Sequence, residues 1–266
     1  MTITKSKLAE ALVSGRLAIT AECLPPRSTD AGAVKKLSSV LAPKLDAVVV
    51  PDNPGEIQGS ALACAAMLAG EGRSSVLSMV TRGRNRVALE SDALGAAALG
   101  VEGFFCISGD HQSLGICPQA AGVFDIDSIQ FTQALKKMMR DGHGFNGHTI
   151  DPRPEFLVGA AAHPYQQPME LSLLRLRKKI AAGADFLLTQ AVADLAGFTR
   201  WMDAVREAGL DQKVAILASV QPNEGVAIAA EMAAALKGVP GVRGIHILSG
   251  GCEGLAAEVI QKAGLV

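Results

Sequence analysis

The sequence predicts a single α/β domain, a (β/α)8 or TIM barrel that spans residues 1–266. Eight short apolar runs alternate with alanine- and leucine-rich stretches long enough to form a helix. The runs are too apolar to leave one face in water, which favours parallel strands buried on both sides. Eight strand–helix units in 266 residues also fit the ~250 residues typical of this barrel. The expected strands are residues 17–23, 45–50, 75–80, 103–107, 156–160, 186–189, 214–218 and 244–248.

The stretches between the strands carry signals for helix starts and stops. Ser28, Thr29 and Asp30 supply capping oxygens before a helix at 31–41. Glycines close the next two helices, at 57–69 and 86–99. The other helices are expected at 128–140, 169–182, 195–208, 225–236 and 255–262.

Two long irregular segments interrupt this pattern, at residues 111–127 and 141–155. The first follows the fourth strand, so we expect it at the C-terminal face of the barrel, where active sites lie in this fold. The second follows the fourth helix and is expected at the opposite face. Loops of this length are usually functional or mobile.

The composition excludes several classes of protein. With 49% hydrophobic residues the chain can bury a large core. A formal net charge of -1 gives no field that would attract nucleic acid. The sequence has neither a signal peptide nor an apolar stretch of ~20 residues that could span a membrane. We therefore expect a cytoplasmic protein without nucleic-acid or membrane partners. We also expect the chain to form a homo-oligomer, although the composition does not bear on this.

The cysteines and histidines form no recognisable cluster. The five cysteines are scattered without paired short spacing, which predicts reduced, mostly buried thiols instead of a disulfide framework. The five histidines are dispersed too. We therefore expect no zinc or iron–sulfur site in this chain.

The barrel prediction nominates the site, because chemistry in this fold sits where strands end and βα loops begin. Polar residues or glycines follow nearly every expected strand. They are Glu22, Asp52, Asn53, Thr81, Arg82, Ser108, Gly109, Asp110, His163, Gln190, Gln221, Ser249, Gly250 and Gly251.

Glu22 is the main candidate for acid–base chemistry. It ends the first strand and is followed by Pro25 and Pro26, so its carboxylate would point into the barrel mouth with little freedom. Desolvation there would raise its pKa, which suits a general acid working near neutral pH. The alternative is a structural ion pair with an interior arginine or lysine.

Two further strand ends offer groups for a flat ligand. Gly109 permits close approach of the backbone, and Asp110 places a negative charge beside it. Gly-Asp also makes ordinary turns, which is the alternative here. Gln190 offers a donor and an acceptor to a heterocycle edge, or it is a hydrogen-bonded residue of the barrel interior.

Three cationic or glycine-rich features could hold an anion. Arg175 and Lys179 lie one helical turn apart, with Lys178 beside them, and could bind a pyrophosphate or form a solvated face. The turn 249–251 is either a barrel phosphate site or a tight turn. The cationic loop 82–86 either meets an anionic ligand or is solvated.

The chain resembles the flavin-dependent methylenetetrahydrofolate reductases over most of its length, and most of all the short bacterial and acetogen-type form without a regulatory domain. Each matching segment alone is weak, but together they occur in the right order at matching barrel positions. The segments are AECLPPRSTD, VVVPDN, TRGRNRVALESDALGAAALGVEGFFCISGDH, FDIDS, FLVGAAAHP, LRLRKKIAAGADFLLTQ and VRGIHIL.

The resemblance implies that a flavin binds at the C-terminal face, either FAD or, as the alternative, FMN. It implies NADH or NADPH as the electron donor and a folate as the substrate. The corresponding pathways are one-carbon metabolism and methionine biosynthesis. Glu22 takes the position of the general acid, Asp110 that of the aspartate near flavin and pterin, and Gln190 that of the glutamine on substrate and nicotinamide. Gln221 is assigned to the substrate. Flavin-contacting positions fall on Asp52, Asn53, Ser108, Gly109, Asp110, His163, Arg175, Lys178 and Lys179.

Several departures from the family pattern keep other functions open. Pro51 replaces a threonine that assists nicotinamide binding, Ala191 replaces a bulkier residue, and a segment that helps to build the folate pocket is missing after Asn223. One alternative is a flavin-carrying subunit that takes electrons from an iron–sulfur partner, or works with a zinc partner subunit, in a methyl-transfer pathway. Another is a pterin-binding methyltransferase component without redox activity.

Overall fold

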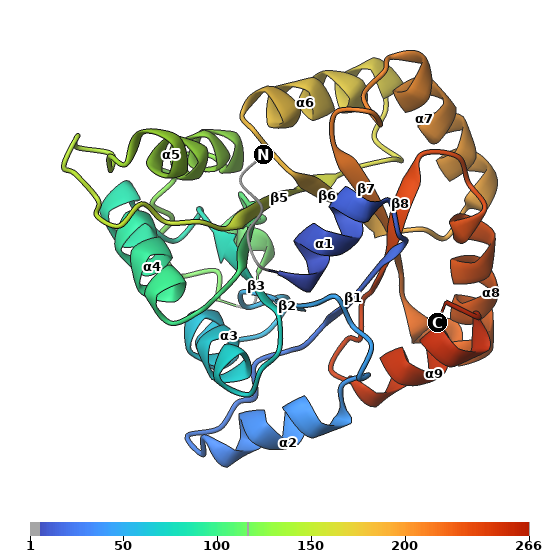
Figure 1. The fold of residues 1–266 in the computed structure, drawn as a ribbon, viewed down its shortest axis with the longest axis horizontal. Helices are drawn as coiled ribbons and strands as arrows, with labels where there is room; N and C mark the ends of the chain where they lie inside the picture. Colours follow the sequence, from blue (N-terminus) through green and yellow to red (C-terminus); the bar gives the residue numbers. More distant parts are fainter. Residues whose placement is uncertain (1–5, 116, 266) are drawn as a thin grey trace.

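The computed structural model describes residues 6–115 and 117–265, which form a closed barrel of eight parallel strands (Figure 1). Each strand pairs with the next in the chain, and β8 closes the barrel onto β1. The predicted (β/α)8 fold is therefore confirmed. The strands are β1 (Ala18–Glu22), β2 (Ala47–Val50), β3 (Ser75–Val80), β4 (Gly103–Ile107), β5 (Leu157–Ala162), β6 (Phe186–Ala191), β7 (Ala215–Val220) and β8 (Val242–Ile247).

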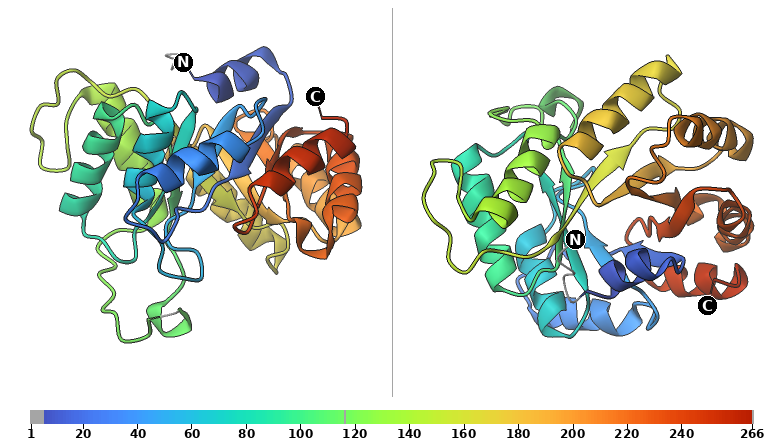
Figure 2. Two further views of the ribbon diagram at one scale, coloured as in Figure 1. Left: turned by 90° about the horizontal axis from the view of Figure 1, so that it is seen from below. Right: turned by 45° about the horizontal axis from the view of Figure 1, so that its top comes forward.

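A ring of helices surrounds the barrel (Figures 1 and 2). Two short 3-10 helices, η1 (Gln112–Leu114) and η2 (Pro222–Glu224), lie in the loops after β4 and β7. The ring helices are α2 (Gly32–Val40), α3 (Ala61–Gly70), α4 (Arg86–Ala98), α5 (Ser128–Asp141), α6 (Met169–Ala181), α7 (Leu195–Glu207), α8 (Val226–Lys237) and α9 (Gly254–Lys262).

One further helix, α1 (Lys7–Ser14), was not predicted from the sequence. It lies across the centre of the barrel in Figure 1, and its buried side chains Leu8 and Leu12 pack against interior residues at the N-terminal ends of the strands. Ser6 caps the helix by accepting a hydrogen bond from the Ala9 N–H. The helix therefore closes the end of the barrel opposite to the expected site.

The barrel interior changes in character from one end to the other. Near α1 it is apolar, and Phe186 fills much of it because Gly159 on β5 has no side chain: a Cβ there would lie 2.3 Å from the Phe186 ring. Toward the C-terminal ends of the strands, buried polar side chains replace the apolar ones. They include Thr20, Ser78, Ser219 and His246. This upper layer forms the floor of the site.

The element boundaries differ from the prediction in ways that affect the site. The strand expected at 186–189 extends to Ala191, so Gln190 lies within β6 and not after it. The helix expected at 57–69 begins at Ala61, because Ser60 caps it and residues 51–60 form a loop at the barrel mouth. As predicted, the cysteines are free thiols and three of them are buried, Cys23, Cys64 and Cys106. No helix of the described chain has the length and apolar character needed to cross a membrane.

Candidate functional site

Two adjoining cavities open at the C-terminal end of the barrel. The larger has a volume of about 670 Å³ and the smaller about 510 Å³. They meet at Ile107, Gly109 and Asp110, which line both. The site therefore lies on the face that the barrel fold predicts, opposite to α1 (Figure 2, left).

Glu22, the last residue of β1, lines the larger cavity. Burial raises the pKa of its carboxyl above the ordinary value, and the carboxylate of Glu253 raises it further. The backbone N–H of Gly250 donates to the Glu22 carboxylate and opposes this shift. The predicted alternative, an ion pair with an interior arginine or lysine, is not formed within residues 6–115 and 117–265. Glu22 can therefore hold a proton at a pH where an exposed carboxyl has lost it.

The turn of residues 249–251 faces carboxylates. Gly250 and Gly251 adopt positive φ angles of 59° and 89°, and the Gly250 N–H is directed at Glu22. The Glu253 Oε1 accepts a hydrogen bond from the Leu24 N–H at 3.0 Å and occupies the start of α9. Two carboxylates at this turn disfavour a bound anion, so the geometry supports the tight turn and not the phosphate site.

Gly109 and Asp110 form the junction between the cavities. Gly109 has a φ of +78°, and a Cβ there would lie 2.5 Å from the Val80 Cγ1, so a side chain would clash. The backbone carbonyl of Asp110 accepts a hydrogen bond from Arg82 Nη1 at 2.5 Å. The Asp110 side chain is exposed and lines both cavities, which places a carboxylate where a ligand could span the two.

The smaller cavity is cationic on the side of α6. Lys179 is buried, with only 7% of its surface exposed, and its Nζ donates to the Ala161 carbonyl at 2.5 Å. Burial and the neighbouring guanidinium of Arg175 lower the pKa of Lys179 to about 8. Among the described residues no carboxylate forms an ion pair with this ammonium. A buried cation without an anionic partner is costly, so this group is suited to pair with an anionic ligand.

His163 connects the smaller cavity with Gln190. Burial lowers the pKa of its imidazole, as do the positive charges of Lys179 and Arg175, while a hydrogen bond with Gln190 and the charge of Asp110 oppose the shift. The backbone carbonyl of His163 accepts a hydrogen bond from Ser172 on α6. Gln190 itself lines neither cavity and reaches the smaller one through this contact.

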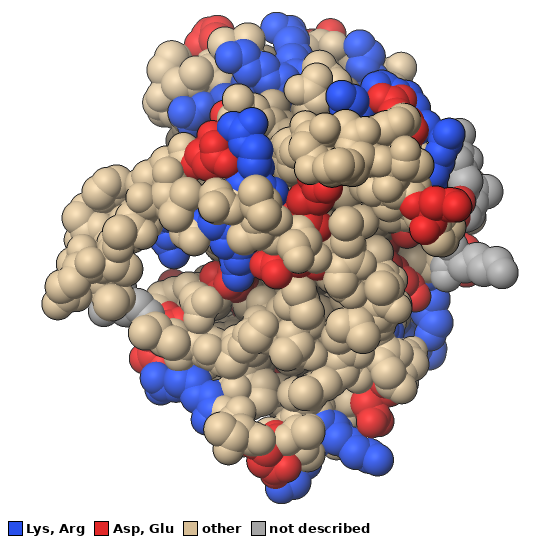
Figure 3. All heavy atoms as spheres, turned by 90° about the vertical axis from the view of Figure 1, so that its left-hand side faces the viewer, with Lys and Arg blue, Asp and Glu red and all other residues tan. Residues whose placement is uncertain are grey.

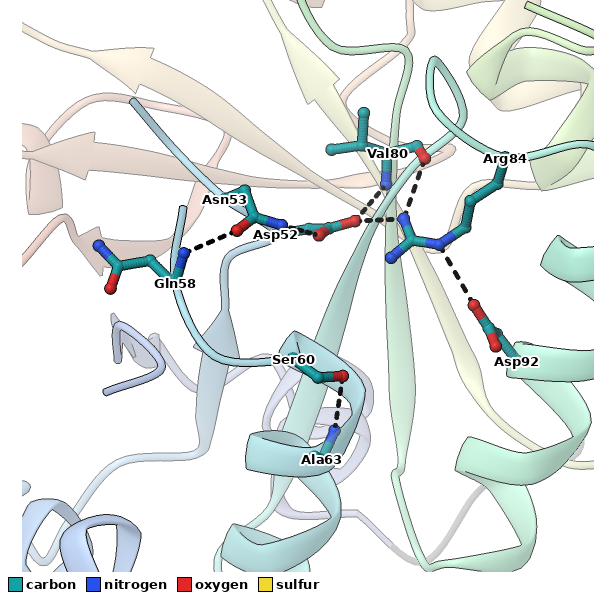
Figure 4. Close-up of polar contacts among 8 residues, drawn as sticks. All are labelled: Asp52, Asn53, Gln58, Ser60, Ala63, Val80, Arg84 and Asp92. Atoms are coloured by element: carbon teal, nitrogen blue, oxygen red, sulfur yellow. Dashed lines mark hydrogen bonds and ion pairs between the residues drawn. The ribbon is translucent and has the colours of Figure 1, made fainter. Parts of the chain in front are cut away.

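Asp52 lines the larger cavity together with Asn53, and its carboxylate is held by contacts within the protein (Figure 4). Its Oδ2 accepts hydrogen bonds from the Val80 N–H at 3.2 Å and from Arg84 Nη1 at 2.5 Å. Its Oδ1 accepts from the Asn53 amide at 3.1 Å, and the Asn53 Oδ1 accepts from the Gln58 N–H at 2.8 Å. Asp52 therefore joins β2 to β3 and, through Asn53, fixes the loop that lines the cavity.

The arginines of the cationic loop 82–86 differ in their surroundings: Arg82 lines the larger cavity, whereas Arg84 and Arg86 pair with carboxylates of the protein. Arg84 pairs with Asp52 and Asp92, and Arg86 forms a two-pronged ion pair with Asp125. These two guanidinium groups are therefore paired within the protein, Arg84 in a half-buried position and Arg86 at the surface. The sequence could not show this, because Asp125 is 39 residues away from Arg86.

The structure does not bring every predicted residue to the cavities. Lys178 is exposed on α6 and lines neither, and Gln221, at the start of η2, is also outside their walls. Sequence reasoning missed His246 and Ser78, two buried polar residues that line the larger cavity. The available signal was a polar residue within an otherwise apolar strand.

The segments around the barrel mouth contribute unequally to the wall of the larger cavity. Its loop residues come from the segments after β2, β3 and β4, whereas β6 contributes Leu188 and Thr189, and the β8 side contributes His246 and Leu248. The segments 111–115 and 117–124 project from the C-terminal face, and Figure 3 shows this part of the chain standing away from the body with an opening beneath it. Stacking of the His111 and Phe124 rings, with centroids 5.7 Å apart, joins its two ends.

The sequence matches the family model described as methylenetetrahydrofolate reductase over residues 7–240. It is 37% identical over 100 residues to methylenetetrahydrofolate reductase 2 of Saccharomyces cerevisiae, covering 35% of this chain and 15% of that protein. It is 36% identical over 61 residues to methylenetetrahydrofolate reductase 1 of Schizosaccharomyces pombe, covering 21% and 10%. The matches thus span a small part of these two relatives.

Solved structures with the same fold include an uncharacterized protein from Clostridium thermocellum that binds two copies of 5-methyl-5,6,7,8-tetrahydrofolic acid. The two structures superpose with a TM-score of 0.63 at 14% identity, and the match covers 97% of this chain and 100% of that chain. A 2,3-dimethylmalate lyase superposes with a TM-score of 0.59 at 18% identity, covering 99% and 87%. At these identities the likeness shows the barrel fold.

Proposed function

This chain belongs to the methylenetetrahydrofolate reductase family, and on that premise we propose that it catalyses the flavin-dependent reduction of 5,10-methylenetetrahydrofolate to 5-methyltetrahydrofolate, or the reverse reaction. The observation that carries the proposal is Glu22: a half-buried carboxyl of raised pKa in a cavity that also presents Asp110. Opening the methylene bridge of this folate requires a proton on a weakly basic nitrogen, which such a carboxyl can donate.

The residues of the smaller cavity fit the phosphate part of a flavin cofactor. Lys179 is a buried ammonium without an ion-pair partner in the described chain, and Arg175 lies beside it. A pyrophosphate between them would provide the missing negative charge through charge-assisted hydrogen bonds. Gly109 leaves the junction open for a flat ring system. We therefore assign FAD to the smaller cavity and the junction, with FMN as the smaller alternative; the flavin, when bound, supplies the hydride.

The protein's own groups have separate tasks in this proposal. Glu22 holds a proton and donates it to N10, the weakly basic nitrogen on the aminobenzoyl side of the methylene bridge. The N10–CH2 bond breaks, and the methylene stays on N5 of the substrate as an iminium cation that a hydride converts to the 5-methyl group. The carboxylate of Asp110, on the wall shared by both cavities, stabilises that positive charge. Gln190, oriented by its contact with His163, provides an amide donor and acceptor at the edge of the site.

A second candidate is a flavin-carrying subunit that receives electrons from an iron–sulfur partner instead of from NADH or NADPH. The observation in its favour is the composition of the wall of the larger cavity. On the side of β7, η2 leads directly into α8, and neither β7 nor the loop after it contributes a residue to this wall. Either role would place the protein in one-carbon metabolism, as a cytoplasmic homo-oligomer. A pterin-binding methyltransferase component remains the candidate without redox chemistry.

The test is an anaerobic assay of the purified chain reconstituted with FAD. Photoreduced protein mixed with 5,10-methylenetetrahydrofolate is expected to reoxidise its flavin and form one equivalent of 5-methyltetrahydrofolate, detected by chromatography. Bleaching of the flavin by NADH or NADPH would identify the reductase, and bleaching only by a reduced iron–sulfur protein would identify the subunit. Failure to bind any flavin, with folate still bound, would contradict both and favour the methyltransferase component.

A further inference from the structure

His246 is a buried residue on β8 that the proposed reaction does not use. Only 2% of its surface is exposed, yet its ring lines the larger cavity. Its Nδ1 lies 2.9 Å from the hydroxyl oxygen of Thr20 on β1, the neighbouring strand. The hydrogen bond that the ring forms within the described residues is the one at Nδ1, and Nε2 forms none there. That nitrogen is therefore left for a ligand in the cavity.

The ring of His246 is uncharged. Its burial lowers the pKa to about 3, and no charged group of the protein contributes to this shift. A neutral imidazole carries one donor and one acceptor. The Thr20 hydroxyl can serve Nδ1 in either role, so Nε2 can present an N–H or a lone pair to the cavity. His246 is thus a neutral hydrogen-bonding group, unsuited to binding an anion.

A second polar group lies in the same floor. Ser78 on β3 is 3% exposed and lines the larger cavity, and its hydroxyl has no hydrogen-bond partner among the described residues. Apolar side chains lie beside these two groups in the wall of the cavity, among them Val49, Phe105 and Leu188. Isolated polar groups in an apolar surface orient a ligand, because a buried polar group left unpaired is costly.

We propose that His246 and Ser78 together recognise the polar edge of a flat fused heterocycle bound in the larger cavity, with Thr20 as the residue that positions His246. The chemistry that fits is a pyrimidine ring with alternating carbonyl and N–H groups, carried on an apolar ring system. The pterin of a folate and the dione end of a flavin both have this edge. The inference rests on the proposed function and adds the residues that determine which ring is accepted.

The test measures dissociation constants by isothermal titration for two probes, 5-methyltetrahydrofolate and FMN, with the folded state followed by circular dichroism. His246→Phe keeps a flat ring without the nitrogen, His246→Gln restores an amide, and Ser78→Ala removes the hydroxyl. The control is Ser75→Ala, which removes a hydroxyl from the same strand but on its outer side, where Ser75 has no partner.

We expect His246→Phe to weaken binding of the recognised ring by about 10-fold, the scale of a hydrogen bond to a buried group. His246→Gln should recover part of the lost affinity. Thr20→Val should weaken binding less than His246→Phe does, and Ser75→Ala should bind both probes as the wild type does. A loss for the folate probe alone identifies the pterin, and a loss for FMN alone identifies the flavin.

Wild-type affinity of folded His246→Phe and Ser78→Ala for both probes would overturn this inference and leave the proposed function standing. A wild-type chain that binds neither probe would overturn the proposed function together with the inference.

Discussion

Arg84 Nη1 lies 2.5 Å from Asp52 Oδ2, and this ion pair joins the loop after β3 to the end of β2 at the wall of the larger cavity. Only 4% of the Asp52 side chain is exposed, and the same oxygen also accepts the Val80 N–H. Asp46 and Asp185 make a related arrangement at the opposite end of the barrel, although Asp52 accepts from the following strand and these two accept from the preceding one. Each of these two accepts a backbone N–H there and pairs with a cation, Arg16 or Lys136. Buried aspartates thus fix neighbouring strands at both ends.

Replacement of Asp52 by asparagine should destabilise the protein, because the Arg84 guanidinium and the Val80 N–H lose a charged acceptor. We expect a loss of about 1.5–3 kcal/mol in the free energy of unfolding, measured by urea denaturation. The matched control is Asp92→Asn, which removes the other carboxylate on Arg84 at a site 37% exposed. That change should cost less than about 1 kcal/mol. Equal losses would show that the Asp52 pair contributes no more than a surface ion pair.

Helix α1 should contribute to stability by closing the barrel. Leu8 is 1% exposed and packs into the barrel interior, so Leu8→Ala should reduce the free energy of unfolding by about 2–5 kcal/mol. Val13 lies on the same helix and is 52% exposed, so Val13→Ala should change it by less than about 0.5 kcal/mol. A small effect of Leu8→Ala would mean that α1 is not packed into the barrel in solution.

Flavin binding should depend on pH through Lys179. The pKa of Lys179 is lowered to about 8, so the amine loses its positive charge as the pH rises through this value, and affinity for the pyrophosphate of FAD should fall between pH 7 and 9. Lys179→Met should bind FAD at least about 10-fold more weakly at pH 7 and show a flatter pH profile. Arg177→Met, on an exposed part of α6, is the control. Unchanged affinity of Lys179→Met, followed by fluorescence quenching, would remove the pyrophosphate from this cavity.

The raised pKa of Glu22 should lower the free energy of unfolding at neutral pH. Since the folded state holds this proton more tightly than the unfolded chain does, stability falls as the pH rises above the ordinary carboxyl value of 4.5. Glu22→Gln keeps the acceptor for the Gly250 N–H without the charge. Its melting temperature should exceed that of the wild type at pH 7.5, and the difference should shrink toward pH 4.5. A variant less stable than the wild type at pH 7.5 would contradict the buried-carboxyl interpretation.

The sequence predicted the barrel well because each strand is a buried run that depends mainly on local composition. It missed α1, although Leu8, Ala11 and Leu12 have helical spacing, because eight residues flanked by charged ones are a weak local signal. Only the closed barrel provides the apolar surface that this helix covers.

Site residues at strand ends were predictable from the fold, whereas their partners were not. Glu22 and Asp110 lie at the cavities, as expected of residues that follow or end a strand. The partners of Glu22 come from the other end of the chain, with Gly250 and Glu253. Similarly, Asp52 follows its strand as predicted, but its carboxylate is engaged by Arg84. Such pairings depend on the closure of β8 onto β1 and on loop paths, which local patterns do not encode.

The central claim is that Glu22 donates the proton that opens the methylene bridge. Stopped-flow measurement of both half-reactions in Glu22→Gln tests it most directly, with Glu56→Gln, an exposed carboxylate paired with Arg27, as control. We expect oxidation of the reduced flavin by 5,10-methylenetetrahydrofolate to slow by at least about 100-fold in Glu22→Gln. Reduction of the flavin by its donor should stay near the wild-type rate, and Glu56→Gln should match the wild type in both. An unchanged folate half-reaction in Glu22→Gln, or equal losses in both half-reactions, would contradict the proposed mechanism.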